Sequence, residues 1–124
     1  MNSLNKMVLI VEDEFLIAET LEAYMEDLGV PVCGRATAAD EAVALAVEHR
    51  PAVILMDVRL IGKKDGVDAA LEVYERVGSR VIFLTGSREP ATIDRINLDH
   101  PYAILFKPTT GNQIRATVTA ALGE

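Results

Sequence analysis

Residues 52–57 have the sequence Ala-Val-Ile-Leu-Met-Asp, a continuous apolar run that ends in a single acid. Three other short apolar runs, at residues 7–11, 81–84 and 103–106, are likewise rich in Val, Ile, Leu and Phe. Continuous runs of this length are typical of strands that are buried on both faces of a parallel sheet. A weaker, more alternating run at residues 30–36 is typical of an edge strand. The sequence therefore predicts five strands.

The segments between these runs have the apolar spacing of helices. The expected buried faces are Ile17, Leu21, Met25 and Leu28; Val67, Leu71 and Tyr74; and Ile114, Val118 and Leu122. Two pairs, Thr37 with Asp40 and Thr110 with Gln113, have the spacing of capping boxes at helix starts. The sparse pattern at residues 87–100 predicts a short or mobile fourth helix, with Pro90 in its first turn.

Five strands that alternate with five helices predict a doubly wound (βα)5 fold of the α/β class, with one parallel sheet. Right-handed crossover connections restrict the possible strand orders, and a weak second strand fits the edge position of the order 2-1-3-4-5. The chain has 124 residues, which is the size of one domain.

The composition excludes several classes of protein. Lys and Arg number 12 and Asp and Glu number 19, which gives a formal net charge of −7. This balance argues against nucleic acid or a membrane surface as a partner, because both favour a basic face. Cys33 is the only cysteine, so we expect no disulfide and a reducing cytoplasmic compartment. The longest apolar run, residues 42–47, is far shorter than the roughly 20 residues that span a bilayer.

Polar side chains stand at the ends of four of the five predicted strands. They are Glu12, Asp13, Asp57, Thr85 and Lys107. Each alone is most simply a solvated strand end or a helix cap, but the ends of parallel strands meet at one edge of the sheet. Three adjacent carboxylates repel one another unless a cation lies among them, and oxygen ligands of this kind suit Mg²⁺. The hydroxyl and the ammonium suit a phosphoryl group in transfer, with Asp57 as the nucleophile.

These residues belong to motifs that resemble a known family. The motifs are Val-Glu-Asp-Glu at 11–14, Ile-Leu-Met-Asp-Val-Arg-Leu at 54–60, Asp-Gly at 65–66, Leu-Thr-Gly-Ser at 84–87 and Phe-Lys-Pro at 106–108. In this order and spacing they resemble the receiver domain of response regulators, of the single-domain CheY-like kind. The resemblance implies a flavodoxin-like, CheY-like fold. It also implies one receiver over residues 1–124, with its core at about 6–122 and no output domain.

The resemblance also implies a role for each site residue. Asp57 is similar to the phosphoacceptor of the family. The metal ligands would be Glu12, Asp13, Asp57 and the backbone carbonyl of Arg59. The expected ion is Mg²⁺, with Mn²⁺ as a possible substitute.

Other residues would then bind the phosphoryl group or control access to it. By the same resemblance, Thr85 and Lys107 would contact the phosphoryl group and act in the switch. Arg59 and Ser87 would line the access path and set the lifetime of the phosphoryl group. The bond before Pro108 would be a cis peptide bond.

The function implied is that of a stand-alone receiver in a two-component phosphorelay. It would accept phosphate from a histidine kinase or a histidine phosphotransfer protein and then control an unknown output protein or act as a phosphate sink. Such a chain catalyses its own phosphorylation and dephosphorylation without being an enzyme for another substrate. It would be cytoplasmic, a monomer or a phosphorylation-dependent dimer, and without nucleic acid or membrane partners. The alternative is a constitutive protein-interaction domain. A flavodoxin-like cofactor binder lacks support, because acids and not a glycine-rich loop follow the first strand.

Three features depart from the usual family pattern. Ile104 stands where many receivers have an aromatic switch residue, and Thr109 follows Pro108 where Phe is frequent. The segment from Asp57 to Gly66 is one residue longer than in many relatives, with Ile61 at a common proline position. These departures predict an atypical switch around an intact phosphorylation site.

Overall fold

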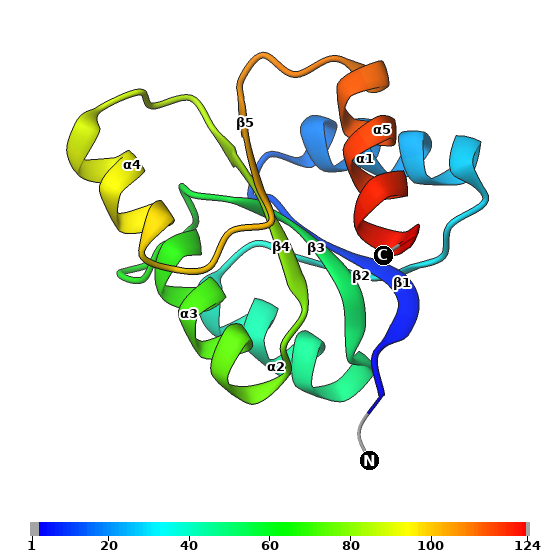
Figure 1. Ribbon diagram of the computed structural model, residues 1–124, viewed down its shortest axis with the longest axis horizontal. Helices are drawn as coiled ribbons and strands as arrows, with labels where there is room; N and C mark the ends of the chain where they lie inside the picture. The colour runs from blue at the N-terminus through cyan, green and yellow to red at the C-terminus, as the bar shows by residue number, and fades with distance from the viewer. Residues whose placement is uncertain (1–2, 124) are drawn as a thin grey trace.

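The computed structural model describes residues 3–123 and contains one five-stranded parallel sheet. Its strands are β1 (Asn5–Val11), β2 (Val32–Ala36), β3 (Pro51–Asp57), β4 (Arg80–Thr85) and β5 (Ala103–Phe106). The strand order is β2-β1-β3-β4-β5, and every pairing is parallel, as the sequence predicts. Figure 1 shows the sheet at the centre of the molecule. The weak second strand does lie at one edge.

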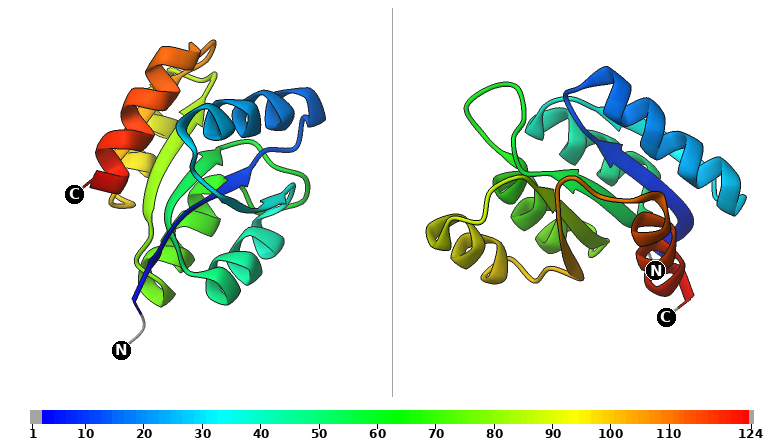
Figure 2. Two further views of the ribbon diagram at one scale, coloured as in Figure 1. Left: turned by 90° about the vertical axis from the view of Figure 1, so that its right-hand side faces the viewer. Right: turned by 90° about the horizontal axis from the view of Figure 1, so that it is seen from above.

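Five helices alternate with these strands and cover both faces of the sheet. They are α1 (Phe15–Leu28), α2 (Ala39–His49), α3 (Gly66–Arg76), α4 (Pro90–Asn97) and α5 (Gly111–Gly123). Figures 1 and 2 show α1 and α5 on one face and α2, α3 and α4 on the other. None of the helices described between residues 3 and 123 has the length and apolar character needed to cross a membrane.

The sheet separates two apolar cores because successive side chains of a strand point to opposite faces. In β1, Leu9 and Val11 pack into the core beneath α2 and α3, whereas Val8 and Ile10 pack into the core beneath α1 and α5. All four side chains are fully buried. This two-sided burial explains why the strands appear in the sequence as continuous apolar runs and not as alternating ones.

The helix ends confirm some of the expected caps and correct others. Thr110 and Gln113 form the predicted reciprocal pair, because Gln113 N donates to Thr110 Oγ1 and Thr110 N donates to Gln113 Oε1. The predicted pair of Thr37 with Asp40 is wrong, since α2 begins after Ala38 and Thr37 N donates to Glu41 instead. A capping box that the sequence did not predict is at α3, where Asp65 is the N-cap residue.

The buried face of α3 also differs from the predicted stripe. Leu71 and Tyr74 are each 46% exposed, whereas Val67, Ala70 and Val73 are buried. The buried face of α3 thus consists of valine and alanine side chains, and the larger Leu71 and Tyr74 lie outside it. Tyr74 instead stacks on the His100 ring, with 3.8 Å between the ring centroids.

Helix α4 is short, as expected, and Pro90 occupies its first turn. Ile96 is the only residue of this helix that is fully buried. Directly beyond the helix, Asp99 is only 4% exposed, and neither of its carboxylate oxygens has a hydrogen-bond partner within the part of the chain that the structure describes. Burial raises the pKa of Asp99 to about 6. The end of α4 therefore carries a buried charge at neutral pH that destabilises the folded state.

Replacing this carboxyl with an amide, Asp99→Asn, should stabilise the protein at neutral pH. Between pH 4 and pH 6 the unfolded chain loses a proton that the folded chain retains, so the free energy of unfolding falls as pH rises. The variant escapes this loss and should gain about 2–3 kcal/mol above pH 6.5. In urea unfolding, the difference in the free energy of unfolding between the variant and the wild type should be roughly half as large at pH 5 as at pH 7.5. Asp94→Asn, at an exposed position of α4, is the control and should show no such gain.

Candidate functional site

The predicted strand-end residues do meet at the carboxyl edge of the sheet. Glu12 directly follows β1, Asp57 is the last residue of β3, and Lys107 directly follows β5. The Lys107 Nζ atom lies 3.2 Å from Asp57 Oδ1 and 3.3 Å from Glu12 Oε1. Glu12 and Asp57 are 2% and 4% exposed. Residues up to 95 positions apart in sequence thus form one compact charged cluster.

Three carboxylates of this cluster could hold a metal ion together. One oxygen from each of Glu12, Asp13 and Asp57 lies within 4.8 Å of the others, and Asp13 is the least buried of the three. An all-oxygen set with one open side fits a hard divalent cation. Burial is the main cause that raises the pKa of Glu12 to about 7; the Glu14 N–H donates to this carboxylate and lowers it, and the Asp57 charge raises it further.

Lys107 provides the positive charge that these acids require. Burial alone would lower the pKa of Lys107, but the carboxylates of Asp57 and Glu12 outweigh burial and raise it above its ordinary value. The ammonium therefore remains charged at neutral pH. It neutralises only part of the charge of the three acids, so the cluster keeps a net attraction for a cation.

Thr85 and Ser87 form the next part of the site. Thr85 is the last residue of β4 and is 2% exposed. The Ser87 N–H donates to Thr85 Oγ1 at 3.0 Å, and Ser87 Oγ in turn accepts from the Glu89 N–H. The threonine hydroxyl is thus bonded to the segment that leads into α4.

The position of Asp57 is fixed from its backbone side by Gly66. The Gly66 N–H donates to the Val58 carbonyl at 2.7 Å. A Cβ atom at Gly66 would lie 2.1 Å from the Asp57 carbonyl oxygen, so no other residue fits here without moving the strand end. This close approach explains the Asp-Gly pair at residues 65 and 66, and it ties the start of α3 to the central carboxylate.

An open cleft of about 960 Å³ surrounds these groups. The expected residues Asp13, Asp57, Arg59, Thr85, Ser87 and Lys107 line it, as do Glu14 and Asp65 of the quoted motifs. The sequence did not single out the other charged and polar lining residues, which are Arg88, Glu89, Thr92 and Arg95. Arg88 lies over the Phe106 ring, with its guanidinium carbon 4.0 Å from the ring centroid. No spacing in the sequence marks these four residues, because they reach the cleft from α4 and the segment before it and not from a strand end.

The structure also places the residues that depart from the usual pattern. Ile104 packs against the core beneath α2 and α3 as an ordinary apolar side chain. The longer segment after β3 is anchored where Ile61 forms a bridge with Ala38, and its N–H donates to the Thr37 carbonyl. The peptide bond between Lys107 and Pro108 is cis.

Comparison with known families decides what this arrangement is. Residues 8–119 match the response regulator receiver domain family. The chain belongs to this family. Glu12, Asp13, Asp57, Thr85 and Lys107 all lie within the matched residues. The receiver fold and a role in two-component signalling follow from this membership.

Several known proteins are similar to this receiver. It is 34% identical to the transcriptional regulatory protein PdtaR of Mycobacterium tuberculosis, over 83% of this chain and 50% of that protein. It is 38% identical to the phyllosphere-induced regulator PhyR of Methylorubrum extorquens, over 93% of this chain and 43% of that protein. The chain thus spans about half the length of these relatives.

A solved receiver structure agrees closely with the fold. The signal receiver domain of a modulated diguanylate cyclase from Desulfovibrio desulfuricans superposes with a TM-score of 0.87 and 34% identity. The match covers 94% of this chain and 92% of that one.

Proposed function

We propose that this receiver accepts a phosphoryl group on Asp57 from a phosphohistidine of a kinase or phosphotransfer protein. The observation that carries this proposal is the contact of Lys107 Nζ with both Asp57 and Glu12, at 3.2 Å and 3.3 Å. It places a cation beside the carboxylate that would attack, in a cleft open to a donor. Preorganised charge of this kind is the main source of catalysis in phosphoryl transfer.

The proposed metal is Mg²⁺, held by Glu12, Asp13, Asp57 and the backbone carbonyl of Arg59. The oxygen-only donor set and the mutual repulsion of three carboxylates support this assignment. When bound, the ion would neutralise the phosphoryl oxygens that face the acids. Asp13, the most accessible of the three, would be the ligand nearest to solvent.

In the transfer step, a bond forms between an Asp57 carboxylate oxygen and phosphorus as the bond from phosphorus to the donor imidazole nitrogen breaks. The imidazole leaves with the electron pair of that bond and takes up a proton. Lys107 and Thr85 would bind the same phosphoryl oxygen from opposite sides. For this the Thr85 hydroxyl must break its hydrogen bond with the Ser87 N–H. The receiver would thus catalyse its own phosphorylation, and water would later attack the same phosphorus in its dephosphorylation.

We propose that the signal leaves through another protein. If Thr85 turns toward the phosphoryl group, the loss of its bond to Ser87 alters the segment before α4 and the surface around that helix. The kinase and the output protein are both proposed as protein partners in the cytoplasm, a compartment that suits the free thiol of Cys33.

Mg²⁺ should raise the melting temperature of the protein by several degrees at millimolar concentration. It would bind the folded site and relieve the repulsion among three carboxylates that are far apart in the unfolded chain. A thermal scan with and without MgCl2 measures this shift, and Asp13→Ala should largely abolish it. The metal site is excluded if Mg²⁺ fails to shift the melting temperature of the wild type, or shifts that of Asp13→Ala equally.

Titration with beryllofluoride, a phosphoryl analogue, tests the proposed switch as a whole. In the presence of Mg²⁺ we expect NMR shifts at Asp57, at Thr85 and through residues 87–100. A constitutive interaction domain on the same fold would give no shifts at any of these positions. A silent titration would therefore favour that second function over phosphorylation.

A further inference from the structure

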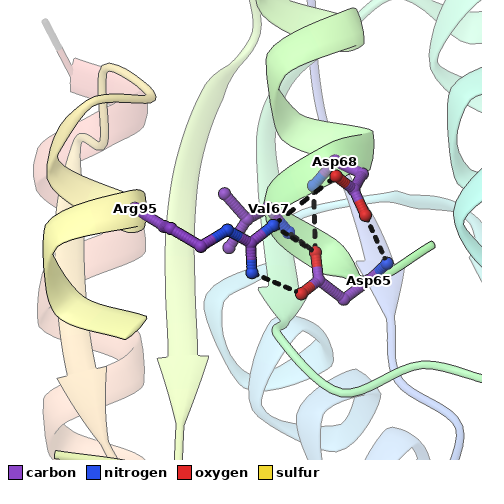
Figure 3. Close-up of polar contacts among 4 residues, drawn as sticks. All are labelled: Asp65, Val67, Asp68 and Arg95. Atoms are coloured by element: carbon purple, nitrogen blue, oxygen red, sulfur yellow. Dashed lines mark hydrogen bonds and ion pairs between the residues drawn. The ribbon is translucent and has the colours of Figure 1, made fainter. Parts of the chain in front are cut away.

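One ion pair connects α4 to α3 across the wall of the cleft. The Arg95 guanidinium donates to both oxygens of Asp65, at 2.8 Å and 3.2 Å, and lies 3.5 Å from Asp68 Oδ1 (Figure 3). Two-point contacts of this kind are the most directional of the charged hydrogen bonds. Only Ile96 of α4 is fully buried, with Ile93 partly buried, so this pair adds to a small set of apolar contacts that hold the helix.

Asp65 is in turn fixed to the phosphorylation site. Its Oδ1 accepts from the N–H groups of Val67 and Asp68, and its own N–H donates to Asp68 Oδ2. The next residue is Gly66, which lies against the Asp57 carbonyl. Partial burial would raise the pKa of Asp65, but the hydrogen bonds from Arg95 and Asp68 lower it below its ordinary value. Asp65 is therefore a charged and immobile anchor.

A second acid, Asp99, lies one helical turn from Arg95 in the sequence and has no partner for its carboxylate within the described residues. Asp99 is almost completely buried, and both of its oxygens lack partners within residues 3–123. The positive charge of Arg95 already acts on Asp99 and lowers its pKa, against the stronger effect of burial. While Arg95 is bonded to Asp65, the Asp99 charge remains unpaired, which is unfavourable for this arrangement.

We propose that Arg95 is a latch with two acidic partners. It holds α4 to the start of α3 through Asp65 in the state described here, and it moves to Asp99 when Asp57 is phosphorylated. The trigger rests on the proposed function: Thr85 leaves Ser87 N for the phosphoryl group, and the segment that precedes α4 is released. The latch would replace the aromatic switch that Ile104 does not provide.

The expected effect of breaking the Arg95–Asp65 pair is moderate, because Arg95 and Asp65 are both partly exposed to solvent. An exposed pair of this kind changes an equilibrium by about two- to fivefold. The apparent affinity of a ligand that binds only the released state changes by the same factor as the equilibrium between the two states. The effects therefore appear as differences in beryllofluoride binding among variants.

The test compares four single and two double variants by titration with beryllofluoride in Mg²⁺. Asp65→Asn keeps the helix cap, since Asn is also a good N-cap residue, and removes the charged pair. It should bind the analogue about two- to fivefold more tightly. Asp99→Asn removes the second, buried partner and should bind the analogue more weakly than the wild type does. Removing a carboxylate near an anion site would by itself tighten binding, so a weaker affinity identifies the latch.

Arg95→Ala supplies the decisive control, because both acids act through this side chain. In its background, Asp65→Asn and Asp99→Asn should lose most of their effects on the affinity. Arg76→Ala removes a similar ion pair, with Glu72, that lies within α3, and it should leave the affinity unchanged. The latch is overturned if Asp65→Asn has no effect, if Asp99→Asn tightens binding, or if both effects persist without Arg95.

Amide hydrogen exchange separates the latch from the phosphorylation itself. In the unphosphorylated protein, Asp65→Asn should speed exchange in residues 90–97, whereas Arg76→Ala should not. If the wild type binds no beryllofluoride, the proposed function fails, and with it the trigger. The exchange rates of residues 90–97 then still decide whether Arg95 holds α4. Equal rates in all variants would show that it does not.

Discussion

Replacing Asp57 with asparagine is expected to abolish phosphoryl uptake. The carboxamide has no anionic oxygen to attack phosphorus, and the acidic cluster loses one of its three carboxylates. Incubation with acetyl phosphate and Mg²⁺, followed by intact-protein mass spectrometry, should show at least a ~100-fold lower rate of gain of one phosphoryl group. The wild-type level of phosphorylation in Asp57→Asn would exclude this residue as the nucleophile.

The matched control for this change is Asp40→Asn. Asp40 lies on α2, is exposed and pairs only loosely with Lys64, at 3.4 Å. It undergoes the same chemical change far from the cleft, so its phosphorylation should equal that of the wild type. Asp57→Asn also removes one of several mutually repelling acids, so its melting temperature should not fall. Loss of uptake in a stable variant then reports on chemistry and not on unfolding.

Lys107→Met should slow phosphorylation by about 10²-fold, because it removes a fixed positive charge beside the phosphoryl oxygens. It should also lower the free energy of unfolding by about 2 kcal/mol at pH 7.5, since Glu12 and Asp57 remain buried without their cation. Phosphorylation time courses and urea unfolding measure the two effects. Millimolar Mg²⁺ should restore part of the stability but little of the rate.

Lys64→Met is the control for this second change. Lys64 makes an exposed ion pair with Asp40, so its loss should change stability by less than about 0.5 kcal/mol and leave phosphorylation unaffected. An unchanged phosphorylation rate in Lys107→Met would show that Lys107 only balances the buried acids.

The sheet and the strand-end residues were predictable from the sequence because their signals are local. A continuous apolar run bounded by polar residues, such as residues 52–56, is typical of a buried strand in a chain of this size, and parallel strands bring their ends together. Glu12, Asp57 and Lys107 could therefore be placed in one cluster before any distance was known.

The rest depends on how elements pack, which the sequence alone does not show. The buried face of α3 includes Val67 of the predicted stripe but also Ala69, Ala70 and Val73, so Leu71 and Tyr74 were wrongly expected to be buried. Arg95 is an ordinary surface charge in the sequence, and only the approach of α4 to α3 joins it to Asp65. Asp99 would be taken for a solvated loop acid, since nothing near it in the sequence signals burial.

The division of the interior by the sheet has a further consequence for recognition. Ile96 of α4 belongs to the core shared with α2 and α3, whereas α1 and α5 have a separate core on the opposite side. A displacement of α4 would thus alter one half of the molecular surface without disturbing the packing of the other. A protein that docks on α1 would meet the same shape before and after phosphorylation, while one that docks around α4 would meet two different shapes. A protein that delivers the phosphoryl group and a protein that responds to it could thereby bind different faces of the same 124 residues.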